Sequence, residues 1–345
     1  MYCLAIETSC DDTCVALLKD GFTILSNVVS SQLDVHRRFG GVVPEIASRR
    51  HLECLVPVLD QACCQAGITL SQIDLVAATS GPGLTGSLLM GLCLAKTVAI
   101  LHQKPFIAVN HLEGHLFASR LDHSDLTPPF ISLIVSGGHT ELVAVNGWGE
   151  YISLGRTRDD AAGEVYDKIA KHLEIGYPGG PLIDTLSQDG NPGRYYFRGG
   201  LEDEENLDFS FSGLKTAVIR TYDRLSELEK KDERLKKDLL ASFQQSVTRT
   251  LWKKTQRAIN QTGFKTVALG GGVSANSSLR TQFQIHGMRH GIKIYLPSPV
   301  LCTDNAAMIG SCGSFHFMRG ETSPLTLEPD PQLRLVSEYP NTPTV

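Results

Sequence analysis

The stretch MYCLAIETSCDDTCVALL (residues 1–18) decides the expected fold of this 345-residue chain. Apolar runs at 3–6 and 15–18 flank a polar turn at 7–12, which is the pattern of a β-hairpin. The same pattern returns at 131–145, where apolar runs flank the small polar turn SGGHT. Two such hairpins predict a fold built by duplication, with one copy in each lobe.

The segments around the hairpins alternate between strand and helix patterns. Residues 75–78 and 106–109 predict strands, whereas 42–66 and 86–101 predict helices. A charged segment at 223–239 predicts a solvated amphipathic helix. Since one hydrophobic core stops growing at roughly 250–300 residues, two lobes are expected. The sequence predicts a two-lobed α/β protein divided as 1–127 and 128–325, with a helical insertion around 150–245 and an irregular tail at 326–345.

Composition restricts the kinds of partner. A net charge of −5 argues against a general basic surface, so any nucleic-acid site must be a local patch. Nine cysteines without a CxxC pair argue against a zinc ribbon and for a reducing compartment. The longest apolar segment, 84–101, is interrupted by Lys96 and reads as a buried helix rather than a membrane span. We therefore expect a cytoplasmic or organellar-matrix protein.

Three glycine-rich turns are candidates for phosphate binding, because residues without a Cβ let backbone N–H groups approach an anion. They are SGG (136–138), GGG (270–272) and GPGLTG (81–86). A glycine turn alone is more often structural, but the first two follow apolar strands in corresponding halves, which favours binding. The chain has no GxxxxGK[ST] motif, which excludes a P-loop nucleotide site.

The motif HLEGH places His111 and His115 four residues apart, on one face of a helix and within reach of one metal ion. The alternative is a pair of ordinary surface histidines. Glu113 follows His111 by two residues, about 200° around the helix, so it points away from such a metal. That placement argues against a metallopeptidase, in which the glutamate would act as the base.

Several acidic residues have both a structural and a functional interpretation. Asp304 opens a predicted helix and is either its N-cap or a third metal ligand. Asp11 either makes an Asx-turn or holds a metal or water near phosphates. A helix is expected to start at Asp159, and acidic residues are common in a first helical turn. Asp167 lies beyond that turn, so this structural explanation does not apply to it. The turn at 177–184 presents the Gly180 N–H and the Asp184 carboxylate to a ribose, or is a structural Pro-Gly turn.

Taken together, ten ordered motifs resemble the TsaD family of tRNA threonylcarbamoyladenosine transferases, whose relatives include the Kae-type proteins. The resemblance runs through nearly the whole chain. It is carried by ETSCDDT (7–13), GGVVPEIASRRH (40–51), SGPGLTGSL (80–88), NHLEGH (110–115), LIVSGGHTEL (133–142), DDAAGEVYDK (159–168), YPGGPLID (177–184), FSFSGLKT (209–216), GGVSAN (271–276) and CTDNAAMI (302–309).

This resemblance implies an actin and Hsp70-like (ASKHA) ATPase fold with duplicated RNase H-like domains and an interlobe cleft that holds an adenine nucleotide. It also implies an acyltransferase that moves threonylcarbamoyl from threonylcarbamoyl-AMP to N6 of adenosine 37 in tRNAs reading ANN codons. The products would be the modified nucleoside t6A and AMP, and the reaction would depend on a metal. A non-enzymatic nucleotide-binding scaffold of the Hsp70 kind remains the alternative.

The resemblance implies functional residues at the positions of this chain that match the family's motifs. One divalent metal would be bound by His111, His115 and Asp304, with Fe(II) expected and Zn or Mn as alternatives. No general base follows from the sequence, and Asp11 is the first candidate to test. The substrate-binding residues would be Ile134, Val135, Ser136, Gly137, Gly138, Asp167, Gly180, Asp184 and Asn276.

The resemblance also implies partners: the tRNA anticodon loop, a TsaB-like paralogue and a small TsaE-like P-loop ATPase, with no membrane. A helical face within 42–59 is expected to pack against a protein partner. Two arginine pairs, at 37–38 and 49–50, are candidates for the tRNA contact, or are solvated helix residues. Arg156 and Arg158 depart from the family pattern, which puts local substrate contacts near Asp159 in doubt.

Overall fold

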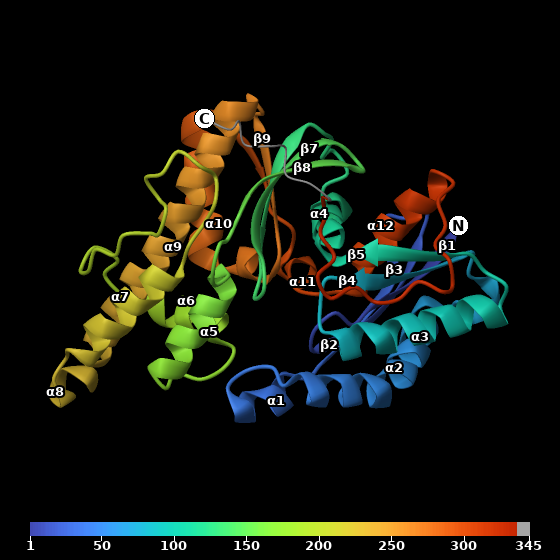
Figure 1. Ribbon diagram of the computed structural model, residues 1–345, viewed down its shortest axis with the longest axis horizontal. Helices are drawn as coiled ribbons and strands as arrows, with labels where there is room; N and C mark the ends of the chain where they lie inside the picture. Colours follow the sequence, from blue (N-terminus) through green and yellow to red (C-terminus); the bar gives the residue numbers. More distant parts are fainter. Residues whose placement is uncertain (337–345) are drawn as a thin grey trace. The chain divides into compact units, whose positions relative to one another are not determined.

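The computed structural model describes residues 1–336, and the part of the expected tail at 337–345 lies outside these residues. The chain forms two compact units (Figure 1). Unit 1 is Met1–Asp125 together with the segment that starts at Thr303, and unit 2 is Leu126–Cys302. No helix within residues 1–336 has the length and apolar character needed to cross a bilayer.

Unit 1 contains a five-stranded sheet in the order β3-β2-β1-β4-β5. The predicted first hairpin is confirmed, since β1 and β2 pair antiparallel from Tyr2 opposite Lys19 to Glu7 opposite Cys14. The strands β4 and β5 continue the sheet in parallel. The strands are β1 (Tyr2–Glu7), β2 (Asp12–Lys19), β3 (Thr23–Ser31), β4 (Leu75–Gly81) and β5 (Phe106–Asn110).

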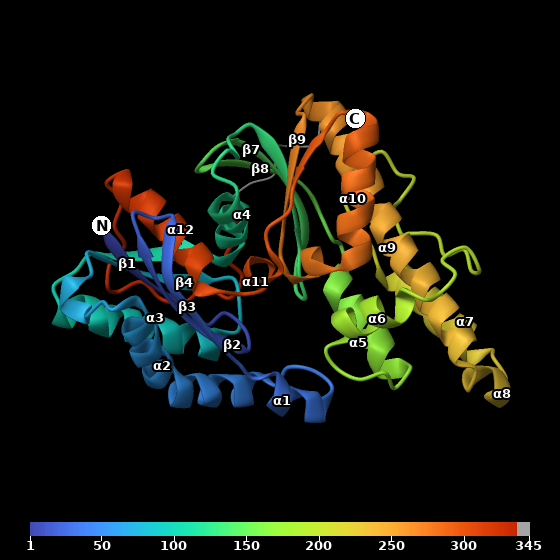
Figure 2. The same cartoon turned by 180° about the vertical axis from the view of Figure 1, so that it is seen from behind.

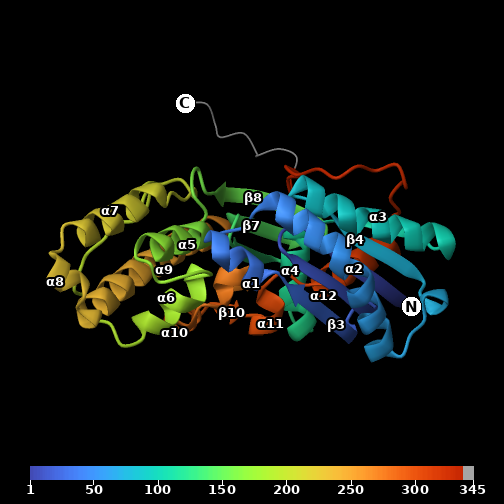
Figure 3. The same ribbon diagram turned by 90° about the horizontal axis from the view of Figure 1, so that it is seen from below.

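Helices cover both faces of this sheet (Figures 1 and 3). The period-2 alternation of β1 explains the two layers, because Leu4 and Ile6 join the core under α2 and α3, whereas Ala5 faces α12. Helices α4 and α12 pack against each other and on β4 and β5. The helices are α1 (Leu33–His36), α2 (Pro44–Ala66), α3 (Thr85–Leu101), α4 (His111–Asp122) and α12 (Ala306–Met318).

The last helix, α12, corrects the expected division of the chain. The sequence predicts residues 303–325 in the second lobe, but they pack in unit 1. Two glycines allow α12 to approach the sheet closely: a Cβ at Gly310 would lie 3.0 Å from Cβ of Ala5, and one at Gly313 would lie 2.6 Å from Cβ of Ala77. The sequence after α12 forms no further helix or strand up to residue 336, as expected for that part of the tail.

Unit 2 repeats the topology of unit 1 in a sheet of order β10-β9-β6-β7-β8. The hairpin β6–β7 is extended by antiparallel β8 on one side and by parallel β9 and β10 on the other. This shared arrangement confirms the duplicated α/β fold. The strands are β6 (Phe130–Val135), β7 (Thr140–Gly147), β8 (Glu150–Arg156), β9 (Thr266–Gly270) and β10 (Lys293–Tyr295).

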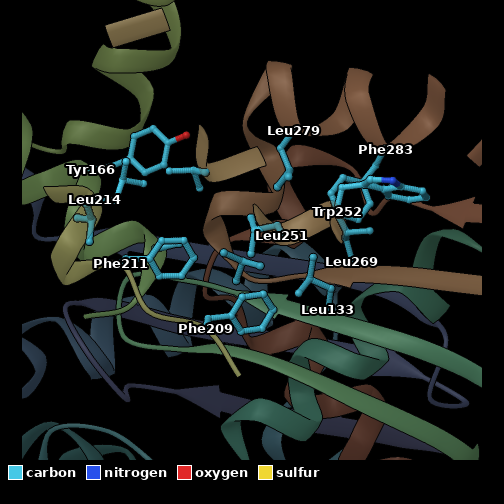
Figure 4. Packing of buried hydrophobic residues seen from close by; sticks show 14 of the residues in the cluster. Leu133, Tyr166, Phe209, Phe211, Leu214, Leu251, Trp252, Leu269, Leu279 and Phe283 are labelled. Carbon is cyan, nitrogen blue, oxygen red and sulfur yellow. The ribbon is translucent and has the colours of Figure 1, made fainter. Parts of the chain in front are cut away.

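The core of unit 2 lies between its sheet and the long helix α9, with α10 beside α9 (Figure 2). Trp252 of α9 meets Phe283 of α10 edge to face, with ring centroids 5.3 Å apart, next to Leu269 of β9 (Figure 4). The helices are α5 (Ala162–His172), α6 (Gly179–Ser187), α7 (Ser212–Asp223), α8 (Glu227–Lys230), α9 (Glu233–Thr262), α10 (Ser277–His290) and α11 (Pro299–Cys302).

The charged segment at 223–239 is not the single helix that the sequence predicted. It contains the end of α7, the short helix α8 and the start of α9. The interruption has a local cause, because the Asp232 carboxylate accepts hydrogen bonds from the backbone N–H groups of Arg234 and Leu235 and so caps a new helix.

Candidate metal and substrate sites

The predicted histidine pair lies at the start of α4 in unit 1. The side chain of Asn110 accepts a hydrogen bond from the Leu112 N–H at 2.8 Å, which caps the helix and fixes its first turn at His111. His111 and His115 then project from one face, with ring centroids 4.7 Å apart. Both side chains are buried, so the alternative of two surface histidines is wrong.

Asp304 completes this group from the segment before α12. Its Oδ1 lies 3.6 Å from Nε2 of His111 and 3.4 Å from Nε2 of His115. The N-cap of α12 is Asn305, whose side chain accepts from the Met308 N–H, so the reading of Asp304 as the helix cap is wrong. The structure therefore brings together the three residues predicted to bind a metal.

Glu7 is a member of this group that the sequence reasoning missed. Its carboxylate is fully buried at the end of β1, where Oε2 lies 3.0 Å from Nδ1 of His111. Thr79 Oγ1 and the Ser9 N–H donate to the same carboxylate, each at 2.5 Å. The signal was available in the sequence as an acidic residue that directly follows the apolar run of a buried strand.

The charges around His111 favour a positive charge on or beside its ring. Burial opposes protonation of His111, but the carboxylates of Glu7 and Asp304 outweigh burial and raise the pKa of His111 to about 9. Burial likewise opposes ionisation of Glu7, and the charge of His111 outweighs it, so the pKa of Glu7 stays below its ordinary value. A metal cation ligated by His111 would place positive charge at the same position, where the same two carboxylates would stabilise it.

The donor set fits one divalent cation. The candidate ligand atoms of His111, His115 and Asp304 all lie within 4.8 Å of one another. Within the described chain, neither ring nitrogen of His115 makes a hydrogen bond of good geometry, although both are buried. Burial lowers the pKa of His115, which keeps its imidazole neutral and able to ligate. Two imidazoles and one carboxylate suit Fe(II), Zn or Mn.

Two more carboxylates lie at the junction of β1 and β2. Asp11 lies in the turn itself, and its expected catalytic role stays a prediction. Asp12, which the sequence reasoning passed over, begins β2, and burial raises its pKa to about 7. A carboxyl that titrates near neutral pH is suited to proton transfer, so Asp12 joins Asp11 as a candidate base.

The glycine turns of unit 2 lie side by side. The turn after β6 is held by the Ser136 N–H donating to the His139 carbonyl at 2.8 Å. Gly271 passes so close to this strand end that a Cβ would lie 2.4 Å from the Val135 carbonyl oxygen, and its φ of +87° also requires glycine. Around Gly137 and Gly138, by contrast, a Cβ would meet nothing within 4 Å. The turn therefore has an open side on which a ligand can approach the backbone.

Ile134 and Val135, which precede this turn, differ from Gly137 and Gly138 in how they could contact a substrate. Both side chains are fully buried in β6. Any contact that they make with a substrate must therefore come from their backbone. Ser136 is also largely buried, and its Oγ accepts a hydrogen bond from the His139 N–H at 3.1 Å.

The other predicted substrate residues form a second group in unit 2. The Gly179 N–H donates to Oδ1 of Asp167 at 2.7 Å, which fixes the start of α6 beside Gly180. Asp184, on the same helix, accepts from the N–H and the hydroxyl of Ser277. Asp184 thus joins α6 to the start of α10.

Gln244 of α9 connects this group and was missed from the sequence. Its Nε2 donates to Oδ1 of Asp184 at 3.2 Å, and its Oε1 accepts from Nδ2 of Asn276 at 2.8 Å. Oδ1 of Asn276 accepts from the Leu279 N–H and caps α10. Gln244 could not be recognised in advance, because one glutamine within a long polar helix has no distinguishing pattern.

We predict that Asn276→Ala lowers the free energy of unfolding by about 1 kcal/mol, the usual cost of losing an N-cap. Asn276→Asp keeps an oxygen to cap α10 but loses the donor to Gln244, so it should retain more stability than Asn276→Ala. Urea unfolding of both variants measures the difference. Unchanged stability in both would contradict the capping role.

The arginines proposed to contact tRNA are partly engaged by acidic neighbours. Arg50 lies 2.7 Å from Glu53, and Arg37 lies 3.8 Å from Asp34. Ion pairs three residues apart on exposed helical surface are typical of solvated residues, so the role in tRNA binding stays a prediction. In unit 2, Arg158 is bound to Asp208 at 2.8 Å.

Solved structures resemble this chain in fold alone. Component A of (R)-2-hydroxyglutaryl-CoA dehydratase from Acidaminococcus fermentans aligns with a TM-score of 0.55 and 15% identity, covering 92% of this chain and 98% of that one. HypF from T. kodakarensis aligns with a TM-score of 0.62 and 14% identity, covering 92% and 48%. These likenesses are consistent with the expected two-lobed actin-like (ASKHA) fold.

Comparison by sequence identifies the family. A relative from Clostridium perfringens, called tRNA N6-adenosine threonylcarbamoyltransferase, is 48% identical over 333 residues, which cover 96% of this chain and 97% of that protein. A relative of the same name from Nostoc punctiforme is 49% identical over 340 residues, covering 96% of each. The model of the family TsaD, described as tRNA N6-adenosine threonylcarbamoyltransferase, matches residues 23–311. The chain therefore belongs to the TsaD family of transferases that modify tRNA.

Proposed function

We propose that this chain forms t6A by moving the threonylcarbamoyl group of threonylcarbamoyl-AMP to N6 of adenosine 37 in tRNAs that read ANN codons. The observation that carries the proposal is the buried group of His111, His115 and Asp304, found in a chain that belongs to a family of such transferases. In the reaction, the adenosine amine forms a bond to the carbamoyl carbon, the bond from that carbon to the phosphate oxygen breaks, and AMP leaves with the electron pair.

The metal would be held by His111, His115 and Asp304, with Glu7 orienting the His111 ring through its Nδ1–H. When bound, it would supply Lewis acidity and a template for orienting the adenylate. Fe(II) is the expected ion, and Zn or Mn suits the same ligands.

The protein's own groups would bind and position the substrates. An exocyclic adenine amine is a weak nucleophile, so positioning and stabilisation of the developing oxyanion should contribute most to the rate. The backbone N–H groups on the open side of the turn, at Gly137 and Gly138, are suited to that oxyanion. Asp167, Gly180, Asp184 and Asn276 would bind the adenylate around the starts of α6 and α10. Asp11 or Asp12 would accept the proton that the amine loses.

The remaining parts of the proposal concern macromolecules. The tRNA would present its anticodon loop to a local basic surface that includes Arg49 and Arg50. A TsaB-like paralogue would pack on the helical face within 42–59, and a TsaE-like P-loop ATPase would act with the pair.

The test supplies purified protein with threonylcarbamoyl-AMP and tRNA, alone and with the two partners, and detects t6A by the mass of the released nucleoside. One AMP should appear for each t6A formed. Treatment with a chelator should stop both products, and addition of Fe(II), Zn or Mn should restore them. Nucleotide binding without AMP release would favour the scaffold alternative. Peptide cleavage that is lost in His111→Ala would favour a peptidase.

A further inference from the structure

Glu113 lies on the opposite face of α4 from His111 and His115, as its position in the sequence predicts. Both of its carboxylate oxygens lie 3.0 Å from Nε2 of His316 on α12. Its side chain is only 9% exposed and that of His316 is 19% exposed, so the contact is largely withdrawn from solvent. The contact joins the two neighbouring helices of unit 1 at a point that the proposed transfer reaction does not use.

A thiol completes a second group of donors at this point. Cys312 precedes His316 by four residues on α12, so the two side chains share one face of that helix. The candidate ligand atoms of Glu113, Cys312 and His316 all lie within 4.8 Å of one another. Cys312 is fully buried and is not part of a disulfide.

The Nδ1 atom of His316 contacts a carboxylate, as the non-ligating nitrogen of a metal-binding histidine usually does. Nδ1 lies 2.7 Å from a carboxylate oxygen of Glu321, and Nε of Arg319 lies 3.3 Å from the other oxygen of that carboxylate. A proton on Nδ1 that is donated to Glu321 directs the Nε2 lone pair toward Glu113. Two acceptors facing each other at 3.0 Å then need a cation or a second proton between them.

A cavity opens beside this group and provides an entry path. It has a volume of about 340 Å³, and its lining includes Glu113, His316 and Glu321. The cavity leaves space for a water molecule as a fourth ligand beside Glu113 and His316. Three protein ligands with one position open to water form a common arrangement around zinc.

We propose that Glu113, Cys312 and His316 form a second metal site, for a borderline-soft divalent cation of which Zn²⁺ is the best match. One thiolate, one imidazole and one carboxylate suit Zn²⁺ better than the hard cations Mg²⁺ and Ca²⁺, which take oxygen ligands. The site is separate from the group of His111, His115 and Asp304, because the two use opposite faces of α4. The alternative is a metal-free imidazolium held between Glu113 and Glu321.

The test measures Zn²⁺ binding to the purified full-length protein after removal of metals with a chelator. Wild type should bind two equivalents of Zn²⁺. Cys312→Ser should bind one, and the double variant His111→Ala, His115→Ala should also retain one. Substitution with Co²⁺ supplies a spectroscopic readout, because only a thiolate ligand gives sulfur-to-cobalt charge-transfer absorption. That absorption should appear in wild type and in the double variant, and should be lost in Cys312→Ser.

Controls separate binding from folding. Cys3→Ser removes another fully buried thiol in unit 1 and should keep both equivalents and the absorption band. Glu321→Gln retains all three ligands and should weaken the second equivalent by about 10–100-fold, the usual effect of removing an outer partner. Absence of the thiolate band from wild type, or a thiolate band that persists in Cys312→Ser, would overturn the proposal and favour the imidazolium alternative.

Discussion

His115→Ala is expected to lower the rate of threonylcarbamoyl transfer by about 1,000-fold. Within the described chain the ring nitrogens of His115 are committed to no hydrogen bond, so ligation is their proposed role, and its loss leaves the cation with two protein ligands. Metal assistance contributes several kcal/mol to such reactions, and about 1.4 kcal/mol corresponds to tenfold in rate. The measurement is the initial rate of t6A formation at saturating substrates, with metal content determined on the same sample.

A buried histidine outside the site distinguishes lost ligation from lost packing. His36 is also fully buried, and its Nδ1 accepts from the Val43 N–H at 3.3 Å. His36→Ala should destabilise the fold in the same manner as His115→Ala but keep the first metal equivalent. If His115→Ala bound metal and catalysed transfer like wild type, the assignment of His115 as a ligand would be wrong.

The second large effect is expected from Glu7→Gln, which should weaken metal binding at the first site by about 10–100-fold. The carboxylate of Glu7 accepts from Thr79, from the Ser9 N–H and from His111 Nδ1. An amide has one oxygen to accept and a nitrogen that only donates, so one of these partners is left unpaired in a buried place. With the amide nitrogen at the position of Oε2, the His111 ring loses the contact that directs its Nε2 toward Asp304.

Metal titration of Glu7→Gln, followed by its transfer rate at saturating metal, tests this expectation. Glu53→Gln on the exposed surface of α2 is the matched substitution and should bind metal like wild type. A dissociation constant for Glu7→Gln equal to that of wild type would show that Glu7 does not orient His111.

Local patterns were enough to predict the hairpins and the helix that carries the two histidines of the proposed metal site. The hairpins and the four-residue spacing of His111 and His115 follow from residues close together in the chain. Glu7 could not be assigned this way, because its partner His111 is 104 residues away and only the folded sheet brings them together. The two alternatives for Asp304, helix cap or metal ligand, could not be separated locally, since Asp304 and Asn305 are equally good caps by composition and only geometry shows that Asn305 caps α12.

The predicted substrate-binding residues of unit 2 show that sequence patterns do not reveal contacts between distant segments. Asp184 and Asn276 were predicted from separate motifs, and nothing in either motif indicates that Gln244 joins them. The second donor group was also outside the reach of sequence patterns. Glu113 and His316 are 203 residues apart, and the small residues that allow α12 to reach the sheet are informative only once its packing is known.

The return of α12 to unit 1 has a consequence for synthesis on the ribosome. Domains usually fold as they emerge, the N-terminal one first. Here the opening unit lacks Asp304 and one of the helices over its sheet until residues 303–318 have been translated. A nascent chain that ends before residue 304 therefore cannot assemble the proposed three-ligand site, so ion loading there must wait until Asp304 has been translated.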